Sequence, residues 1–466
     1  MKKVIFILIF VVSNILAKDI KIDIEQAISM ALENNHLNKI SKINLEIAQA
    51  QYEQALSANY PSLNAVLYAN RDDTDTIFQQ RGVFNLPASL VGAISALTPL
   101  GTPATTTISA DIDTIAKGRD TARGSLELNY AIYSGGKIEA IINQAKLNKE
   151  VAKTSIVRSE NEVTFDVKKY YYGYVLTNEL YKLVSKIHKN MDFSTTLAKD
   201  FLEHSSNLKI NKTDYLNVKL TTSLLQSTLT KLDLNKQMLK SAMANLIGLN
   251  WDDEIEIEYK EDEILNQNIS LQKMIERAYI SNPDMNKINL AVQIKEEQIS
   301  ESQAANYPQV GLFGNINKTY NSYEYGYLNK DNENSWNIGI AVKMSLFDGF
   351  RTKNDILEKQ LNKKVIEEQK ILFEEALALQ LKNEFLTSTI GYKQIKILKD
   401  SVDIAIENSE LNLSGFQYEM VEAKDLIQSQ LMETYVKADY LKNIHDYLLS
   451  LATIDKLVGD KINENF

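Results

Sequence analysis

The chain has 466 residues, of which 44% are hydrophobic and 24% are charged, and it carries a formal net charge of −10. That length allows more than one ordinary domain or one very extended domain, while the negative charge argues against nucleic-acid binding, which needs a basic surface. Because the sequence contains no cysteine, disulfides, a catalytic thiol and a lipidated cysteine are all excluded.

Residues 1–17 are predicted to be a secretory signal peptide. A basic start is followed by the apolar run from Val4 to Val12, and Ala17 offers a small residue for cleavage. No other run approaches the roughly 18 apolar residues that a membrane helix needs. We therefore expect a Sec-type route out of the cytoplasm and a mature chain without a helical or lipid anchor.

A helix of about 35 residues is then expected to end at Ala-Asn-Tyr-Pro, residues 58–61, because proline cannot continue a helix and holds the preceding residue extended. Tyr60 and Pro61 would mark a change from helix to strand. The same tetrapeptide returns 247 residues later, where Tyr307 and Pro308 would mark the same change. This recurrence predicts two internal structural repeats.

Each tetrapeptide opens a block that is predicted to be a β-hairpin, residues 61–133 in the first repeat and 308–347 in the second. The blocks alternate with period two: in SWNIGIAVKMSL, apolar residues from Trp336 to Leu346 take every second position. Each candidate strand has about ten residues, the length of a tilted membrane-spanning strand.

Glycine turns are expected to lead from each hairpin back to helix. Gly135 and Gly136 lie in YSGGK, and Asp348 and Gly349 lie in FDGFR. The Gly-Gly pair is not a phosphate loop, because the Lys-Ser/Thr that such a loop requires does not follow it.

Long helices are predicted over residues 137–247 and 351–458, which contain no proline and three glycines in total. Each would run for roughly 65 residues, about 100 Å at 1.5 Å per residue, before a polar tip and a returning helix. Apolar residues at steps of three and four, such as Val163, Val167 and Tyr170, form more than one stripe. Two stripes need neighbours on two sides, which suits a closed ring of helices better than an isolated pair.

The domain organisation expected from these features is a first repeat at 18–250, a second repeat at 270–466, and between them an acidic connector at 251–269. The acidic run WDDEIEIEYKEDE in this connector could bind a cation, but a solvated linker is the simpler interpretation. The four histidines, His36, His188, His204 and His445, show no metal-ligand spacing. We therefore expect no enzyme, no cofactor and no metal site.

The order of these features, present twice, resembles the outer-membrane efflux proteins typified by TolC. The segment GFQYEMVEAKDLIQSQ, residues 415–430, also looks like the helix-tip segment of that family. The resemblance implies an α+β membrane protein in which three protomers each give four strands to a twelve-stranded outer-membrane β-barrel. The barrel would be continued by a long periplasmic α-helical coiled-coil barrel, with the connector in its equatorial region. Independently, four strands cannot close a barrel and an open edge cannot face lipid, which favours a cyclic oligomer.

By this resemblance the protein would be the outer-membrane channel of a tripartite efflux or type I secretion system, and a passive conduit. The implied partners are two further copies of the chain, outer-membrane lipid, a periplasmic adaptor protein and an inner-membrane pump, either an antiporter or an ATP-driven exporter. Nucleic acid is not among them. The alternatives are a coiled-coil structural protein or adhesin, which would not explain the hairpins, and the adaptor itself, in which helices are nested inside β domains.

The resemblance also implies a gate at the periplasmic tip, where the second pair of helices would turn near Ser414 and Gly415. Asp425 matches one acid of the family's pore ring, and Gln428 stands where a second acid is usual. Phe416 matches a constriction tyrosine, without the hydroxyl, so we expect apolar contact there in place of a hydrogen-bonded lock.

Other acidic residues of the tip leave alternatives open. Glu419 and Glu422 could add charge to the ring. Asp214 takes the matching place in the first repeat, where it could simply cap its helix. A solvated or capping acid is also the alternative for Asp425.

The first hairpin is 33 residues longer than the second, since Tyr60 to Tyr133 spans 73 residues and Tyr307 to Phe347 spans 40. The insertion includes FNLPASLVGAISALTPLGTPATTT, which is unusually apolar for an external loop. We expect this loop to fold on itself or on its symmetry mates, and three copies to narrow the outer mouth.

Overall fold

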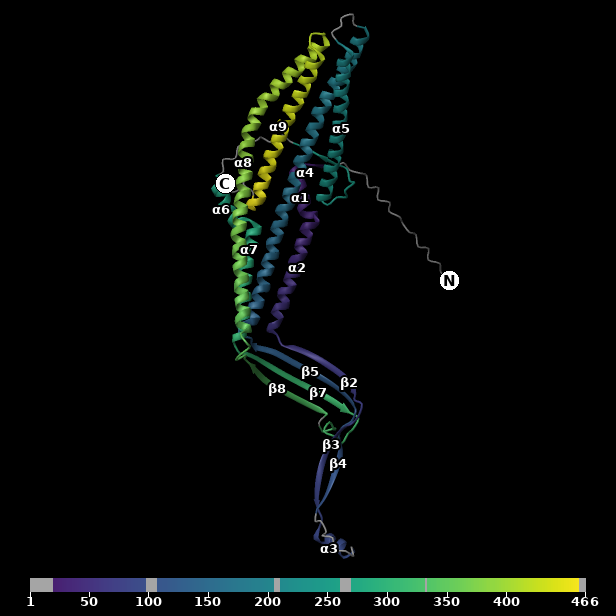
Figure 1. Ribbon diagram of the computed structural model, residues 1–466, viewed down its shortest axis with the longest axis vertical. Coiled ribbons are helices and arrows are strands. Elements are labelled where there is room, and N and C mark those ends of the chain that lie inside the picture. The colour runs from purple at the N-terminus through teal and green to yellow at the C-terminus, as the bar shows by residue number, and fades with distance from the viewer. Residues whose placement is uncertain (1–19, 98–106, 205–209, 260–269, 332, 461–466) are drawn as a thin grey trace, which may run out of the picture. The chain divides into compact units, whose positions relative to one another are not determined.

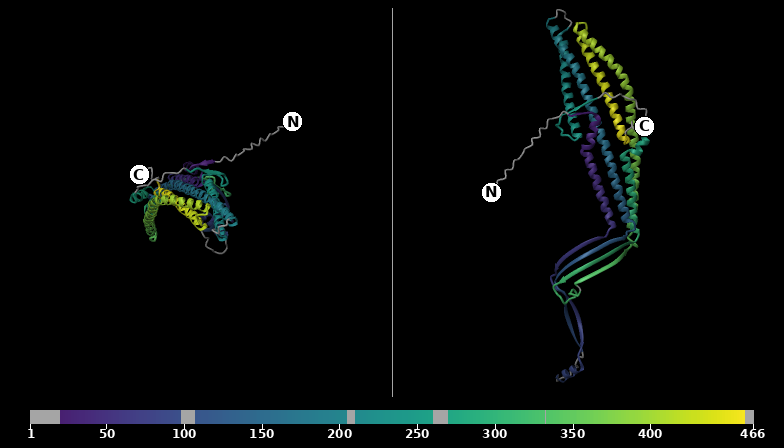
Figure 2. Two further views of the ribbon diagram at one scale, coloured as in Figure 1. Left: turned by 90° about the horizontal axis from the view of Figure 1, so that it is seen from above. Right: turned by 180° about the vertical axis from the view of Figure 1, so that it is seen from behind.

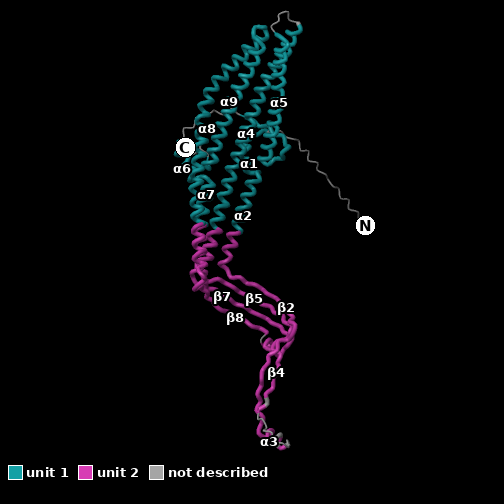
Figure 3. The backbone as a smooth tube through the Cα atoms, in the orientation of Figure 1, with its two compact units in different colours: residues 1–50, 146–294, 362–466 teal, residues 51–145, 295–361 magenta. Residues whose placement is uncertain are grey.

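The computed structural model describes residues 20–97, 107–204, 210–259, 270–331 and 333–460, in two compact units (Figures 1 and 3). Unit 1 comprises residues 1–50, 146–294 and 362–466, and unit 2 comprises residues 51–145 and 295–361. The predicted signal peptide lies outside the described residues.

Unit 2 contains a four-stranded antiparallel sheet with the order β2-β5-β7-β8. The strands are β2 (Ser62–Arg71), β5 (Asp120–Tyr133), β7 (Gln309–Asn321) and β8 (Asn334–Lys343). The first two come from the first predicted hairpin and the last two from the second. The chain therefore contributes one sheet of four strands, and its two outer strands, β2 and β8, each have one unpaired edge.

The strand register gives this sheet two unlike faces, because successive residues of a strand point to opposite sides. Paired residues across the sheet form one apolar row, Ala65, Leu126, Ile316 and Trp336. The adjacent row on the opposite face is polar: Asn64, Glu127, Asn315 and Asn337. The apolar face is open to solvent in the single chain, and Trp336 is 74% exposed.

The apolar insertion of the first hairpin is not the loop that we expected. It forms a second, two-stranded antiparallel sheet of β3 (Thr76–Asn85) and β4 (Thr107–Lys117), with the helix α3 (Ala88–Leu97) between them. Residues 98–106 lie outside the described residues. The insertion does fold on itself, as one of the two expectations had it, but its regular strands and helix were not predicted, although TIFQQRGVFN and TISADIDTIAK alternate between apolar and polar residues. We call the β3–β4 pair the ribbon.

Each Ala-Asn-Tyr-Pro is preceded by the same series of elements. In the first half these are α1 (Ile24–Asn34), α2 (His36–Leu56) and the short η1 (Ser57–Asn59). In the second half they are α6 (Leu271–Ser281), α7 (Pro283–Gln303) and η2 (Ala304–Asn306). Corresponding elements have equal lengths of 11, 21 and 3 residues.

The single helix of about 35 residues that we expected in each half is thus broken, at Asn35 and at Asn282. Both asparagines are extended, with ψ of 135° and 125°. Asn35 donates its side-chain Nδ2–H to the Leu246 carbonyl at 3.0 Å, and Asn282 donates to the Leu457 carbonyl at 2.8 Å. Each asparagine therefore ties the break to the end of a returning helix.

The predicted long helices are α4 (Lys137–His204) and α8 (Arg351–Gln417), with 68 and 67 residues. The returning helices are α5 (Lys212–Leu246) and α9 (Ala423–Val458). Figure 1 and the further views in Figure 2 show these helices running side by side in unit 1. No helix within the described residues combines the length and the hydropathy that crossing a membrane would demand.

The helix α8 ends later than predicted, because Gly415 stays helical. The chain leaves the helix at Glu419, which has a φ of 57°, and the Met420 N–H donates to the Gly415 carbonyl at 2.8 Å. This is a left-handed helix cap on a residue other than glycine. The turn between α8 and α9 therefore spans residues 418–422.

The connector is only partly the solvated linker that we expected. Its residues Ile255–Ile257 form β6, which pairs in parallel with β1 (Ile20–Ile22). Ile255 and Ile257 are buried, while Glu256 forms an exposed ion pair with Lys21 at 3.3 Å. Residues 260–269 lie outside the described residues.

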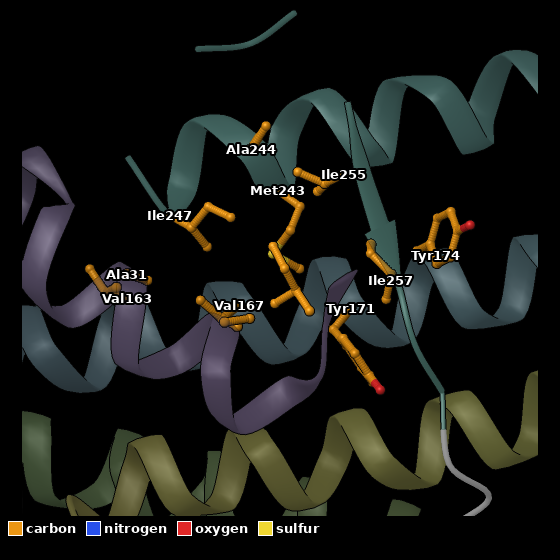
Figure 4. Packing of buried hydrophobic residues seen from close by; sticks show 12 residues of the cluster. Ala31, Val163, Val167, Tyr171, Tyr174, Met243, Ala244, Ile247, Ile255 and Ile257 are labelled. Atoms are coloured by element: carbon orange, nitrogen blue, oxygen red, sulfur yellow. The ribbon is translucent and has the colours of Figure 1, made fainter. Parts of the chain in front are cut away.

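A core cluster in unit 1 joins this small sheet to the helices α1, α4 and α5 (Figure 4). Val163 and Val167, predicted as part of an apolar run, are both fully buried in it. A corresponding cluster in the second half joins α6, α8 and α9 through Met274, Ala278, Leu377, Leu381, Ile454 and Val458.

Candidate functional site

The predicted helix-to-strand transitions lie where they were expected. Tyr60 and Tyr307 directly follow η1 and η2 and are both extended, with ψ of 151° and 153°. Each donates its backbone N–H to the carbonyl three residues back, at 3.0 and 3.1 Å. Pro61 and Pro308 come next, and β2 and β7 begin one residue later.

Glycine is required at the strand-to-helix turn of the first half for a steric reason. Gly135 has a φ of 67°, and a Cβ there would lie 2.7 Å from the Ala304 carbonyl oxygen and 2.8 Å from Tyr307 Cβ. The turn that leaves the first hairpin therefore packs on the transition that opens the second. Gly136 and Gly349 have φ of 91° and 69° with open space around them, so only their backbone conformation favours glycine.

Asp348 lies three residues before α8 and accepts hydrogen bonds from the first turn of that helix, as a capping residue does. Its carboxylate accepts hydrogen bonds from the Thr352 hydroxyl and, at 2.9 Å, from the Thr352 backbone N–H. These bonds, led by that from the hydroxyl, hold the pKa of Asp348 below its usual value.

The helix tip consists of the α8–α9 turn, residues 418–422, and the residues directly flanking it. Phe416 is fully buried there, in a cluster with Val184, Ile187 and Leu426, and its ring lies 6.2 Å from that of Phe201 in an edge-to-face contact. In the described chain Phe416 is thus a core residue of the tip. Its side chain is not available for contacts across a pore in this arrangement.

The acidic residues predicted at the tip, and Asp214 at the start of α5, differ in their roles. Asp214 forms a capping box with Asn211 at the start of α5, through two bonds of 3.0 Å, which agrees with the capping alternative. Asp425 lies in the first turn of α9 and is exposed, and Gln428 follows three residues later, also exposed. Glu422 is the N-cap residue of α9 and makes no side-chain capping hydrogen bond.

A groove of about 630 Å³ runs between α5 and α9 near the tip. Asp214 and Gln428 both line it, so the structure brings together one predicted residue from each half. The rest of the lining is largely apolar and includes Leu220, Leu224, Ile427, Leu431, Met432 and Tyr435. Sequence reasoning missed this groove, although the spacing of Leu220 and Leu224 is that of a helix face.

Sequence reasoning also missed a buried polar network that links α4 to the second pair of helices. Glu433 on α9 is 1% exposed and lies 3.1 Å from Lys186 Nζ on α4. One turn away, the buried Gln430 receives a hydrogen bond from Asn190 at 3.3 Å and donates to the Ser409 hydroxyl at 2.8 Å. Nothing in the sequence separates these residues from the many surface acids and amides of such helices.

No group of three or more histidine, aspartate or glutamate side chains that could hold a metal ion occurs in the part of the chain that the structure describes. What the described residues supply is a sheet with one apolar and one polar face, long helices, and an acidic tip.

Comparison with known proteins relates this fold to that of outer-membrane channels. Residues 274–460 match the family model described as outer membrane efflux protein. The fold is similar to that of the Campylobacter jejuni CmeC outer membrane channel, with a TM-score of 0.75 at 13% identity over 94% of this chain and 85% of that one. The outer membrane protein VceC from Vibrio cholerae gives 0.72 at 14% identity, over 94% of this chain and 96% of that one.

A membrane protein from Pseudomonas aeruginosa has a TM-score of 0.74 at 16% identity, over 95% of this chain and 91% of that one. No curated protein matches the chain in sequence. The predicted resemblance to the outer-membrane efflux proteins is confirmed. The TM-scores show that the chain shares its fold with the solved structures, and at such low identities they show the fold alone.

Proposed function

We propose that the protein is the outer-membrane channel of a tripartite efflux or type I secretion system. In this proposal it is a passive conduit of three copies, with a twelve-stranded barrel in the outer membrane and helices that continue it into the periplasm. The observation that carries the proposal is the four-stranded sheet, with one apolar face, one polar face and two unpaired edges.

The unpaired edges of β2 and β8 limit how this sheet can lie in a membrane. Unpaired backbone groups are costly in lipid, so a membrane sheet must close on itself. The edge strands β2 and β8 have ten residues each, the length of a tilted membrane-spanning strand. Pairing of β8 with β2 of the next copy removes both edges, and three copies of four strands give the even strand number typical of such barrels.

Partners follow from the same proposal. A conduit without chemistry of its own needs an energy source, which we assign to an inner-membrane pump, joined through a periplasmic adaptor. The exposed apolar groove between α5 and α9, with Leu220 and Tyr435 in its lining, supports contact with another protein near the tip. The acids that would face the pore there are Asp425, Glu419 and Glu422, with Gln428 beside them, whereas the buried Phe416 is left out.

Native mass spectrometry of the full-length protein, purified in detergent from outer-membrane fractions, tests the assembly. We expect a main species of three chains. A monomer or a dimer as the main species would contradict the proposal.

Two neighbouring residues of β8 test the membrane face. Ile340 lies on the apolar face and is 65% exposed, while Ala341 lies on the polar face. Arginine on a lipid-facing position costs about 2–4 kcal/mol near the midplane. We therefore expect Ile340→Arg to reduce the amount of heat-stable trimer recovered from outer membranes, and Ala341→Arg to leave it near the wild-type level. Equal recovery of the two variants would reject the assignment of the faces.

A further inference from the structure

The ribbon, strands β3 and β4, has one face without charge. The register pairs Phe78 with Thr114 and Gln80 with Ile112, and these residues share a face with Phe84, which lies four positions after Gln80 on the same strand. A Cβ at Gly82 would lie 2.8 Å from Phe84 Cε2 and 3.2 Å from Ile112 Cδ1, which places both side chains over the glycine on that face. We call it the Phe78–Phe84 face.

The opposite face of the ribbon carries its charged residues Arg81, Asp111 and Asp113. Arg81 Nε donates to Asp111 Oδ1 at 3.0 Å, and Asp113 is paired with Gln79 in the same register. This face also carries the exposed side chains of Ile77 and Val83, so the two faces of the ribbon differ in charge, and only the Phe78–Phe84 face is free of it.

The Phe78–Phe84 face is uncovered in the single chain. Phe78 is 60% exposed, Phe84 52% and Ile112 42%. An isolated two-stranded hairpin is only marginally stable in water. A ribbon of this length is therefore expected to gain its stability from a surface that covers the apolar face.

Lipid is a poor candidate for that cover, because ion pairs separate the ribbon from the sheet. Arg71, at the end of β2, forms a two-bond pair with Asp120, at 2.7 and 3.0 Å. Directly beyond it, Lys117 lies 2.8 Å from Asp72. Such charges are costly within hydrocarbon, and the ten residues of β2 already match a membrane-spanning strand. The ten residues of β3 extend the ribbon by about 33 Å beyond these two ion pairs, and this length would lie in water.

A second copy of the same chain is the cover that the topology favours. The ribbon continues β2, which is an edge strand, so in the proposed trimer every ribbon starts where one copy meets the next. Three ribbons around one axis can turn their Phe78–Phe84 faces toward each other and their Arg81–Asp111 faces toward water.

We propose that the ribbons of neighbouring copies pack together through their Phe78–Phe84 faces outside the membrane. This inference rests on the proposed trimeric channel and assigns a contact surface that the barrel itself does not require. The ribbon is thereby a second interface between copies, made by side chains, in addition to the strand pairing of the barrel.

Single cysteines test this contact cleanly, because the natural chain has none. Gln80 and Gln79 are adjacent, both exposed and identical in type, and they lie on opposite faces of the ribbon. The variants Gln80→Cys and Gln79→Cys are therefore matched. Each is purified as the full chain, its mass is measured under native conditions, and it is treated with a short bis-maleimide before denaturing electrophoresis.

We expect trimers of both variants, and cross-linked pairs of chains for Gln80→Cys only. Gln79→Cys should instead react with a water-soluble mono-maleimide at the rate of an exposed thiol. Trimers in which both variants cross-link equally, or neither does, would overturn the inference and leave the channel intact. Protection of Gln80→Cys without cross-linking, combined with quenching of a probe there by lipid-soluble reagents, would assign the face to lipid and also overturn it. Absence of trimers in the wild-type protein would overturn the proposed function itself.

Discussion

In the proposed channel, the charge at the helix tip depends on a few single residues. Asp425 is exposed in the first turn of α9, where a carboxylate is also favoured by the positive end of the helix. Three copies would place three such charges around one axis. In water a pair of unit charges at contact is worth about 1 kcal/mol, so the ring should attract multivalent cations.

We expect Asp425→Ala to weaken block by multivalent cations from the periplasmic side by about a hundredfold, because three contacts of about 1 kcal/mol each are lost and 1.4 kcal/mol corresponds to a factor of ten. Planar-bilayer recordings of purified trimers measure the block. Gln428→Ala is the control, because it shortens a neutral side chain on the same helix. If the Asp425→Ala channel is blocked at the same cation concentration as the wild type, Asp425 is a solvated acid without a role in the gate.

We expect replacement of the asparagine at either helix break to lower the free energy of unfolding. Asn282 is 5% exposed, donates to the Leu457 carbonyl, and accepts from the Met285 N–H at 2.9 Å. Asn282→Ala leaves both groups without this partner, at a cost of about 1–3 kcal/mol. The thermal midpoint of unfolding, followed by circular dichroism, should fall. Asn245→Ala, on the exposed surface of α5, should leave the thermal midpoint unchanged within experimental error. Equal shifts for the two variants would contradict a stabilising role of the Asn282 hydrogen bonds.

At the scale of elements, the ends of the returning helices are fixed by close contacts. Gly459 caps α9 with a φ of 84°, and a Cβ there would lie 2.6 Å from the Ser281 carbonyl oxygen. Gly248 repeats this arrangement after α5, with a φ of 84° and a Cβ that would lie 2.3 Å from Asn34 Cβ. Each returning helix thus docks on the break between two helices of its own half.

Gly459→Ala should therefore destabilise the protein more than Gly349→Ala. Both positions have a left-handed backbone, which costs a residue with a Cβ about 1–2 kcal/mol. Only Gly459 also lacks space, since nothing lies within 4 Å of a Cβ built at Gly349. Thermal unfolding of the two purified variants compares them directly. A larger loss of stability for Gly349→Ala would show that the backbone near Ser281 can shift to accommodate a Cβ at position 459 without an energetic cost.

The sequence allowed the long elements to be predicted, because their periodicity extends over many residues. The segment SWNIGIAVKMSL, of which β8 covers all but the last three residues, and the helices around Val163 and Leu381 repeat their apolar spacing often enough to outweigh local exceptions. The tetrapeptide at Tyr60 and Tyr307 fixed the transitions through the chemistry of proline.

Features that depend on single tertiary contacts could not be predicted in this way. The break at Asn35 has no helix-breaking residue and is held by a bond to Leu246, 211 residues away. The end of α8 uses Glu419 in a conformation that favours glycine, so Gly415 was the more obvious position. Burial of Phe416 depends on four helices meeting, and a pattern on one helix cannot reveal it.

At the scale of the whole molecule, the ribbon is the part of the chain that we expect to control the outer mouth. Replacing residues 77–116 by Asn-Gly keeps Lys117 beside Asp72 and supplies a tight hairpin turn. The shortened protein should still form trimers, because the β2 and β8 edges are intact. Its single-channel conductance in planar bilayers should rise, since three ribbons no longer narrow the exit.

Deleting only α3, residues 88–97, is the matched comparison, because it removes the end of the insertion and keeps the ribbon. Its conductance should stay closer to that of the wild type. Unchanged conductance in the Asn-Gly variant would reject the constriction, and loss of trimers there would show instead that the ribbon is needed for assembly.

The pairing of β5 with β7 also has a consequence for how the protein is made. Their register joins Thr121 to Asn321, so the centre of the sheet bridges 200 residues of chain. If the predicted signal peptide directs export from the N-terminus, β2 and β5 leave the cytoplasm before β7 does. Contacts of such long range form slowly and leave strand edges exposed in the meantime. In that case we expect an open edge on β5 until β7 arrives, and periplasmic chaperones to be needed most at this stage.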